Sequence, residues 1–473
     1  MTARAVNIRT EQDPTVVAPE GPLQQRILIV GQGSTGKVYA SEVVEMLRIS
    51  EVAEVFGSGS PIHRAAERLF NSGIDRVAIA PVQEETSATA AESTITPTVS
   101  VGARDQMYLL SIAGVEKSFN VPATAVLADI LLSVESLINK DLSLPVTALK
   151  DATKITLTSK WKALGANEIK VTGSGPVGAR ISFAITDMAG GTLEEDPATI
   201  LAKALETDIT LVINTLTSET LSSFEAFCDT RWSERVHRPV MCITGSTLAT
   251  IAEVIAITDS VHHREDRNIF FPVFGSESLG MDIATAAAYN ISQVGTDNPP
   301  QDYAGSLLKG VAPAALVPIF TERDLLVESG SCSFLQRDGA VYMEDTFTMY
   351  HPDGVSLPIY QYAVDVVRIQ NVTHRVATIF ESAIWNGCPI IEDGQPTTNP
   401  KAKSPSMAVA ELRGLQDELA LDAIITGTGD TKKGITVTMP AGNNKKLEIV
   451  FPVKLSGNGS IYDIVQSVNV GGI

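Results

Sequence analysis

Residues 27–70, ILIVGQGSTGKVYASEVVEMLRISEVAEVFGSGSPIHRAAERLF, contain the pattern on which the fold depends. The first four residues, 27–30, form an apolar run that predicts a buried strand. A helix follows later in the stretch, with Ser60 as its N-cap and Gly73 as its stop signal. RVAIA at 76–80 predicts a second strand, and a strand, a helix and a strand in this order predict parallel pairing. The stretch therefore opens either a nucleotide-binding domain or a structural α/β core.

The glycine-rich segment Gly31–Lys37, GQGSTGK, has the spacing of a phosphate-binding loop, in which backbone amides cradle phosphates and the lysine reaches the outer ones. Position 38 is valine, however, where such a loop needs Ser or Thr to bind Mg²⁺. We therefore interpret the segment as a strand-to-helix turn whose glycines supply tight geometry. A P-loop nucleotide hydrolase remains an alternative, but no cofactor is predicted.

A second candidate for chemistry is the adjacent pair His262 and His263, which Arg264, Glu265 and Asp266 follow. Adjacent residues on a helix point about 100° apart, and no third ligand stands at a metal-binding spacing. We interpret the pair as a solvated helix exit and predict no metal site. The sequence also lacks a GxSxG elbow with an assignable His and Asp, so no catalytic residues are predicted.

The composition is that of a globular protein of several domains. The 473 residues are 44% hydrophobic, enough for a large core and two to four domains. The net charge of -19 argues against nucleic acid as a partner, because phosphate binding needs a basic surface. The charge is also uneven: the segment from Lys401 onwards carries +1, which leaves -20 on the first 400 residues. The last segment is therefore expected to meet a different environment or partner.

Neither membrane insertion nor a disulfide framework is expected. The N-terminus has no apolar signal region, and the most apolar long window, 240–258, is interrupted by Glu253. The cysteines match neither a metal spacing nor a disulfide pattern, so buried free thiols are predicted. They are Cys228, Cys242, Cys332 and Cys388.

The order of elements predicts an α/β, multidomain chain: a doubly wound core, interrupted by an inserted α+β or β-rich domain and followed by an α+β C-terminal inner domain. Extended arms flank these domains. The expected parts are an N-terminal arm at 1–22, the core at 23–86 and 196–325, the insertion at 87–195, the inner domain at 326–457 and a C-terminal strand arm at 458–473.

Within these parts, alternation and capping signals predict individual elements. The insertion should contain strands at 107–112, 116–121, 146–149, 153–159 and 179–186 and a helix at 124–139. The second half of the core should contain strands at 209–213, 240–243 and 269–273 and helices at 197–205, 218–229 and 247–257, the last capped by Ser246. The C-terminal part should contain a hairpin around Asp338-Gly339, helices at 359–385 and 406–421, and strands at 435–439, 446–455 and 461–470. In the second of these helices, Met407, Leu412, Leu415 and Leu419 lie on or near one face.

The two ends of the chain are the most specific feature. An extended arm and an isolated strand cannot satisfy their backbone hydrogen bonds alone. Disordered tails are one explanation, but 461–470 is too apolar and β-branched for a solvated tail, so we favour strand addition to a neighbouring subunit. The predicted intersubunit strand residues are Ile461, Tyr462, Ile464, Val465, Val468 and Val470.

Five stretches together resemble the tail sheath proteins of contractile-tailed, Mu-like bacteriophages of the myovirus type. They are ILIVGQ at 27–32, FGSGSPIHRAAERLF at 56–70, ITLTSKWKALGANEIKV at 155–171, DMAGGT at 187–192, and TERDLLVESGSCSFLQRDGAVYMEDTFTMYHPDG at 321–354. They run in order over residues 25–360, and the block ERDLLVESG with the hairpin after it is the most specific.

The resemblance implies a structural protein without enzymatic activity, located in the virion tail and assembled in the host cytoplasm. Its subunits would form a six-start helical homopolymer around a tail tube and contract to drive the tube through the host cell envelope for genome delivery. The implied partners are further copies of the chain, the tail tube protein, and the baseplate and tail terminator proteins. An alternative is the sheath of a phage-derived contractile injection machine, such as a tailocin or a secretion system.

The resemblance also suggests a meaning for the uneven charge. In this family the C-terminal part lines the lumen and contacts the tube through a helix and nearby basic residues. The candidates here are the helix 406–421 and the side chains of Lys401, Lys403, Arg413, Lys432 and Lys433. We expect them to face an acidic tube surface.

Overall fold

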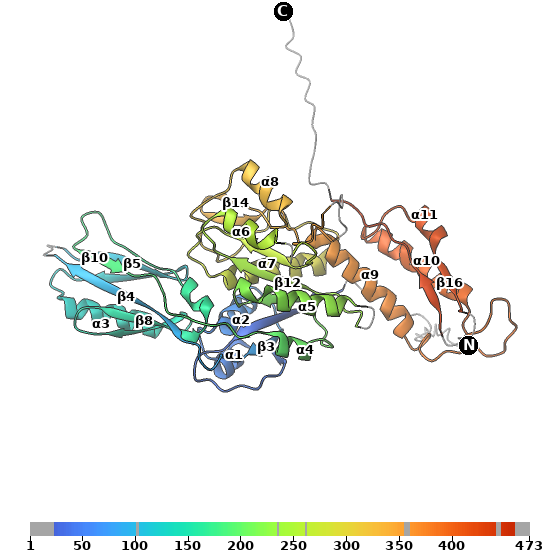
Figure 1. The fold of residues 1–473 in the computed structure, drawn as a ribbon, viewed down its shortest axis with the longest axis horizontal. Helices are drawn as coiled ribbons and strands as arrows, with labels where there is room; N and C mark the ends of the chain where they lie inside the picture. The colour runs from blue at the N-terminus through green and yellow to red at the C-terminus, as the bar shows by residue number, and fades with distance from the viewer. Residues whose placement is uncertain are drawn as a thin grey trace, which may run out of the picture. The chain divides into compact units, whose positions relative to one another are not determined.

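The structure is a computed structural model that describes residues 23–100, 104–233, 236–260, 263–353, 360–440 and 446–458. The chain divides into two compact units (Figure 1). The larger unit is Gln24–Gln370, and the smaller one contains Leu23 and the described residues from Asn371 onwards. The expected mixed α/β class is confirmed. No helix in the described ranges is long and apolar enough to cross a membrane.

A six-stranded sheet forms the centre of the larger unit, with the order β13-β12-β11-β1-β3-β2. Strand β1 (Ile27–Gln32) pairs in parallel with β11 (Leu211–Asn214) and β3 (Val77–Val82). Parallel pairing continues to β12 (Met241–Ser246) and β13 (Ile269–Pro272). The expected core strands and their parallel arrangement are thus confirmed. The antiparallel edge strand β2 (Val44–Met46) was not predicted.

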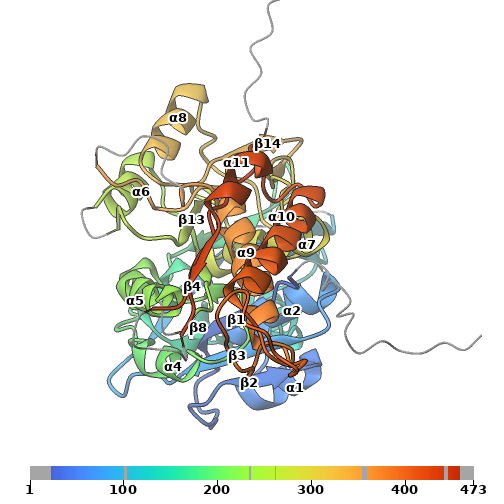
Figure 2. The ribbon, with the colours of Figure 1, turned by 90° about the vertical axis from the view of Figure 1, so that its right-hand side faces the viewer.

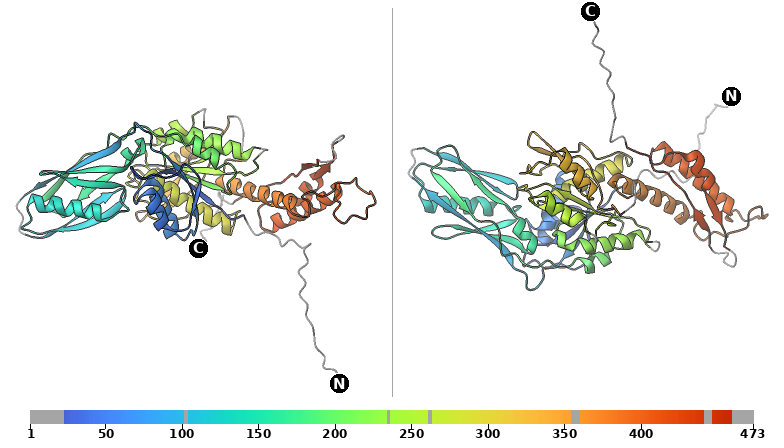
Figure 3. Two further views of the ribbon diagram at one scale, coloured as in Figure 1. Left: turned by 90° about the horizontal axis from the view of Figure 1, so that it is seen from below. Right: turned by 45° about the horizontal axis from the view of Figure 1, so that its top comes forward.

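Helices cover both faces of this sheet (Figure 3). Ile27 and Ile29 of β1 pack into one apolar cluster, whereas Leu28 and Val30 pack into another. The first cluster includes residues of α1 (Ile49–Phe56), α2 (Pro61–Asn71), α6 (Ile251–Thr258) and α7 (Gly280–Asp297). The second includes residues of α4 (Ala198–Lys203) and α5 (Leu221–Trp232). A strand buried on both faces explains why the sequence shows an unbroken apolar run instead of alternation.

The predicted N-cap and stop residue of α2 are confirmed. Ser60 Oγ accepts a hydrogen bond from the backbone N–H of His63 at 3.2 Å, and Gly73 adopts a left-handed φ of 104°. The expected cap of α6 is wrong. Ser246 ends strand β12, and the helix begins after Thr250, which exchanges hydrogen bonds with Glu253 in a capping box. The Thr-x-x-Glu pattern therefore determines this helix start.

Helix α7 was missed because its sequence, GMDIATAAAYNISQVGTD, has no apolar stripe. Most of its residues are small and most are buried. A Cβ atom at Gly280 would lie 2.6 Å from the carbonyl oxygen of Gly245 in β12, so glycine lets the helix approach the sheet. Buried Asp282 of α7 forms ion pairs with Arg64 at 2.7 Å and Arg68 at 2.8 Å, both from α2.

The segment between β3 and α4 forms a second core of its own. It contains a four-stranded sheet, β10-β4-β8-β7, and a three-stranded sheet, β6-β5-β9. Helix α3 (Leu127–Lys140) packs with them (Figure 1). The strands are β4 (Ala90–Val99), β5 (Gln106–Ile112), β6 (Val115–Val121), β7 (Val146–Lys150), β8 (Ile155–Lys162), β9 (Val171–Ser174) and β10 (Ile181–Ile185).

Two of these strands, β4 and β9, were missed. On β4 the buried positions alternate, but two of them are Ala91 and Ser93, so the apolar signal is weak. The strands expected at 107–112 and 116–121 are confirmed as β5 and β6, which form an antiparallel hairpin with positive φ at Ala113 and Gly114. The hairpin at Asp338-Gly339 is also confirmed: it joins β14 (Phe334–Arg337) to β15 (Ala340–Met343) after helix α8 (Phe320–Glu328).

Helix α9 (Ala363–Glu381) spans the boundary between the units, and the rest of the smaller unit follows it (Figure 2). Helix α10 (Pro405–Leu421) confirms the helix expected at 406–421. After it come α11 (Thr428–Thr431) and an antiparallel pair, β16 (Thr436–Thr438) and β17 (Glu448–Val450), both shorter than expected. The C-terminal inner domain was expected to begin at residue 326, whereas the two compact units divide between Gln370 and Asn371.

Candidate functional surfaces

The glycine-rich segment after β1 does not have the geometry of a phosphate-binding loop. Such a loop leads directly into a helix whose N-terminus faces the phosphates, whereas this one leads into β2. Two of its donors have partners within the protein: Gly33 N–H donates to Tyr39 Oη at 3.0 Å, and Lys37 Nζ donates to the carbonyl of Glu54 at 2.9 Å. The expected strand-to-helix turn is therefore wrong in its second half, and the phosphate cradle is absent from this described segment.

The glycines of this region instead contact the inserted segment. Thr35 N–H donates to the carbonyl of Lys160 at 2.7 Å, and Lys160 Nζ donates to the carbonyl of Ser58 at 3.1 Å. Gly59 has a φ of 81°, and a Cβ there would lie 2.2 Å from the carbonyl oxygen of Leu144. Only glycine permits this approach. Residues 35 and 58–59 thus contact the second core and hold it against the first.

The carboxyl ends of β1 and β11 mark the point where the strand order reverses, which is where open α/β sheets commonly bind ligands. Here the inserted segment fills that crevice. Gln32 and Thr215 of the sheet lie against Trp161 and Glu194, and the remaining space is about 10 Å³. Burial raises the pKa of Glu194 to about 7, although a hydrogen bond from Gly165 N–H opposes the shift. A nucleotide does not fit in this space.

The five basic residues predicted to contact a tube have different surroundings. Lys401 and Arg413 are exposed. Lys403 is half-buried, with Nζ 5.5 Å from the centre of the Trp385 ring. Lys432 pairs with Asp417, and Lys433 lies 3.5 Å from Asp430. Lys401, Arg413 and Lys433, whose side chain is 80% exposed, are therefore the most accessible of the five.

A groove that the sequence did not reveal lies in the smaller unit, beside α10. Its volume is about 490 Å³. Met407, Trp385 and Ile379 supply apolar lining, and Glu411 and Lys403 supply charges. Met407 was expected near the buried face of α10, but its side chain is 47% exposed beside this groove, whereas the other three expected apolar residues are buried.

The outer edges of the pair β16 and β17 pair with no other described strand. A two-stranded sheet alone is marginally stable in water, so these edges are suited to accept a further strand. The predicted C-terminal arm, Ile461, Tyr462, Ile464, Val465, Val468 and Val470, lies outside the described residues, as does the N-terminal arm at 1–22.

The prediction of buried free thiols is confirmed for three of the four cysteines. All four are free; Cys228, Cys242 and Cys332 are buried and Cys388 is half-buried. The expected solvated helix exit at the histidine pair is wrong for His263. Helix α6 ends at Thr258, and the His263 side chain is only 15% exposed in the following turn. His262 lies outside the described residues.

Solved structures share this fold, although no protein-family model and no curated protein sequence matches the chain. The anti-feeding prophage helical sheath in its contracted state is 9% identical, with a TM-score of 0.50 over 100% of both chains. A chain of the six-fold symmetrised anti-feeding prophage baseplate is 9% identical, with a TM-score of 0.50 over 99% of this chain and 100% of that one. A sheath tail protein from Listeria innocua is 12% identical, with a TM-score of 0.49 over 93% and 94%.

Proposed function

We propose that this chain, which has the fold of a contractile sheath protein, is the structural subunit of a contractile tail sheath. It polymerises as a six-start helix around a tail tube and contracts to drive the tube through the host cell envelope for genome delivery. The observation that carries the proposal is the similarity to a contracted helical sheath over the whole of both chains. The partners are further copies of the chain, the tail tube protein, and the baseplate and terminator proteins of a virion tail assembled in the host cytoplasm.

The inserted domain at 87–195 faces outward, and the C-terminal domain at 326–457 faces the tube. The uneven charge supports this arrangement, because the segment from Lys401 carries +1 while the rest carries -20. Lys401 and Arg413 contact an acidic tube surface. Both are exposed in the smaller unit, where their charges are accessible to a partner.

The arms link the subunits. Residues 461–470 of one subunit add a strand to the β16–β17 pair of a neighbour, whose outer edges have no partner among the described strands. A contact that joins two different surfaces without closing a ring generates a helical filament. Arms of this kind keep subunits joined while they rotate and slide during contraction.

Contraction needs no nucleotide in this account. The extended lattice is held kinetically, and larger interfaces in the contracted lattice supply the free energy. The surroundings of the glycine-rich segment support this view, since its backbone groups dock the inserted segment. If the chain were instead a nucleotide hydrolase, Lys37→Ala would abolish saturable Mg-ATP or Mg-GTP binding.

The second candidate is the sheath of a phage-derived injection machine. The full-length matches to anti-feeding prophage structures favour it. The two candidates differ in whether a capsid is attached to the tail, so electron microscopy of native particles separates them.

The arms provide the test of the proposal. Replacing residues 461–470 with a Gly-Ser segment of equal length should give a soluble, folded chain that forms no long tubes, because only the added strand is lost. The matched control is Ile461→Val with Ile464→Val, which keeps an apolar β-branched strand and should keep tube formation. Tubes of normal length from the Gly-Ser variant would refute the role of the arm.

A further inference from the structure

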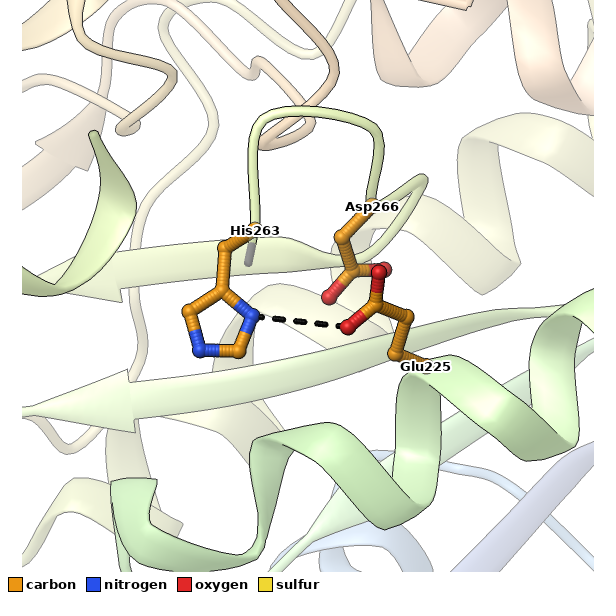
Figure 4. Close-up of side chains that lie close together, drawn as sticks. All are labelled: Glu225, His263 and Asp266. Carbon is orange, nitrogen blue, oxygen red and sulfur yellow. Dashed lines mark ion pairs between the residues drawn. The ribbon is translucent and has the colours of Figure 1, made fainter. Parts of the chain in front are cut away.

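Three potential metal ligands converge between helix α5 and the turn that precedes β13 (Figure 4). Glu225 comes from α5, and His263 and Asp266 come from the turn. Their ligand atoms all lie within 4.8 Å of one another, and His263 Nδ1 is 3.6 Å from Glu225 Oε2. The site belongs entirely to the larger unit and is separate from the surfaces described above.

Asp266 provides the observation that points to a ligand. It is 1% exposed, and its Oδ1 accepts a hydrogen bond from the backbone N–H of Asn268 at 2.9 Å. Its Oδ2 is buried without a hydrogen-bond partner, and its carboxylate lies beside the side chains of Glu225 and His263. A buried carboxylate oxygen without a partner costs free energy, which a bound cation would recover.

The donor set indicates which cation fits. One imidazole nitrogen and two carboxylate oxygens suit a first-row divalent transition metal, whereas Ca²⁺ and Mg²⁺ prefer oxygen ligands alone. Metal–ligand bonds of about 2.0–2.2 Å place ligand atoms roughly 3.3–4.4 Å apart, depending on their angle at the metal. Ligand atoms that lie up to 4.8 Å apart therefore need to approach one another by at most roughly 1–1.5 Å to bind a tetrahedral ion.

We propose that Glu225, His263 and Asp266 form a structural site for a divalent transition-metal ion, of which Zn²⁺ fits the donor set best. The ion joins helix α5 to the turn before β13, which is an edge strand of the central sheet. It thereby fixes the outer end of the sheet in the larger unit. A water molecule completes the coordination, so this ion has three protein ligands where structural Zn²⁺ sites usually have four.

The competing explanation is a shared proton. Burial raises the pKa of Asp266 well above its usual value, and the negative charge of Glu225 raises it further. A protonated Asp266 would donate its proton to Glu225 and satisfy both groups without a metal. A metal site predicts that added Zn²⁺ binds at this cluster, whereas a shared proton predicts that it does not.

The test is calorimetric titration of the full-length chain with Zn²⁺, after treatment with a chelator. We expect saturable binding of one ion per chain that is lost in Asp266→Asn and in His263→Gln. The control is His237→Gln, which changes an exposed histidine outside the cluster and should leave binding unchanged. Absence of binding, or binding that both cluster variants retain, would overturn the proposal.

A second measurement covers the case in which the variants fold poorly. The unaltered chain loaded with Co²⁺ in place of Zn²⁺ should show the visible absorption of a low-symmetry site with nitrogen and oxygen ligands, and Zn²⁺ should displace it. A spectrum identical to that of hydrated Co²⁺ would contradict the site. Chelator treatment should also lower the melting temperature of the unaltered chain, and no change in that temperature would contradict a structural ion.

Discussion

Asparagine in place of Asp282 should destabilise the larger unit severely. Asp282 is fully buried in α7 and pairs with Arg64 at 2.7 Å and with Arg68 at 2.8 Å. Arg64 is only 5% exposed, so the substitution leaves its guanidinium buried beside a neutral amide. Removing one partner of a buried ion pair costs about 3–5 kcal/mol. The matched control is Asp208→Asn at the surface pair with Arg26, which should cost less than about 1 kcal/mol.

The assay is equilibrium unfolding in guanidinium chloride at pH 7, followed by the fluorescence of Trp161 and Trp232. Replacing Trp385 by Phe in every variant removes the signal of the smaller unit. Burial raises the pKa of Asp282, but Arg64 and Arg68 outweigh burial and hold that pKa below 3.8. The ion pair therefore stabilises the fold above the unfolded pKa of about 3.9, and this contribution disappears as the pH falls through the lower folded pKa. A loss of stability at pH 7 no larger than that of Asp208→Asn would show that the buried ion pair does not stabilise the fold.

Two further predictions concern the buried crevice and the basic surface. Burial raises the pKa of Glu194 from 4.5 to about 7, so its contribution to stability is present below pH 4.5 and is lost as the pH rises to about 7. The free energy of unfolding of Glu194→Gln should therefore exceed that of the original chain at pH 8, by no more than about 3 kcal/mol. At pH 4.5 the two should be equally stable. Equal stability at both pH values would contradict this prediction. Lys401→Glu with Arg413→Glu should leave polymerisation intact but prevent extended assembly around tubes, whereas the same charge change at exposed Lys140 and Lys150 should not. Unchanged assembly of the first variant around purified tubes, seen by electron microscopy, would remove the tube-contact assignment.

Local signals predicted those parts of the fold that neighbouring residues determine. The apolar run at 27–30 identified β1, and Ser60 identified the start of α2, because a buried strand and a cap each have a short, specific pattern. The Asp338-Gly339 turn was equally clear, since both residues adopt positive φ. Elements whose burial depends on distant partners were missed. Helix α7 is the main case: its small residues suit close packing against β12, which the sequence places far away.

The same limit applies to the candidate sites. The glycines at 31–37 fit a phosphate loop by spacing, and only the three-dimensional structure shows that this region docks the inserted segment. The histidine pair lacked a third ligand because Glu225 precedes His263 by many residues and reaches it from another helix. The basic residues near α10 were chosen from the family resemblance together with the uneven charge, and neither could separate exposed Arg413 from Lys432, which pairs with Asp417.

Electron microscopy of the purified full-length chain, with helical reconstruction of any polymer, shows directly whether the chain forms a sheath. A sheath subunit should form hollow tubes with six subunits in each ring, in which the smaller unit lines the lumen and a strand from one subunit pairs with β16 or β17 of another. A chain that stays unpolymerised at high concentration and in the presence of tubes would contradict it. So would a polymer without a lumen.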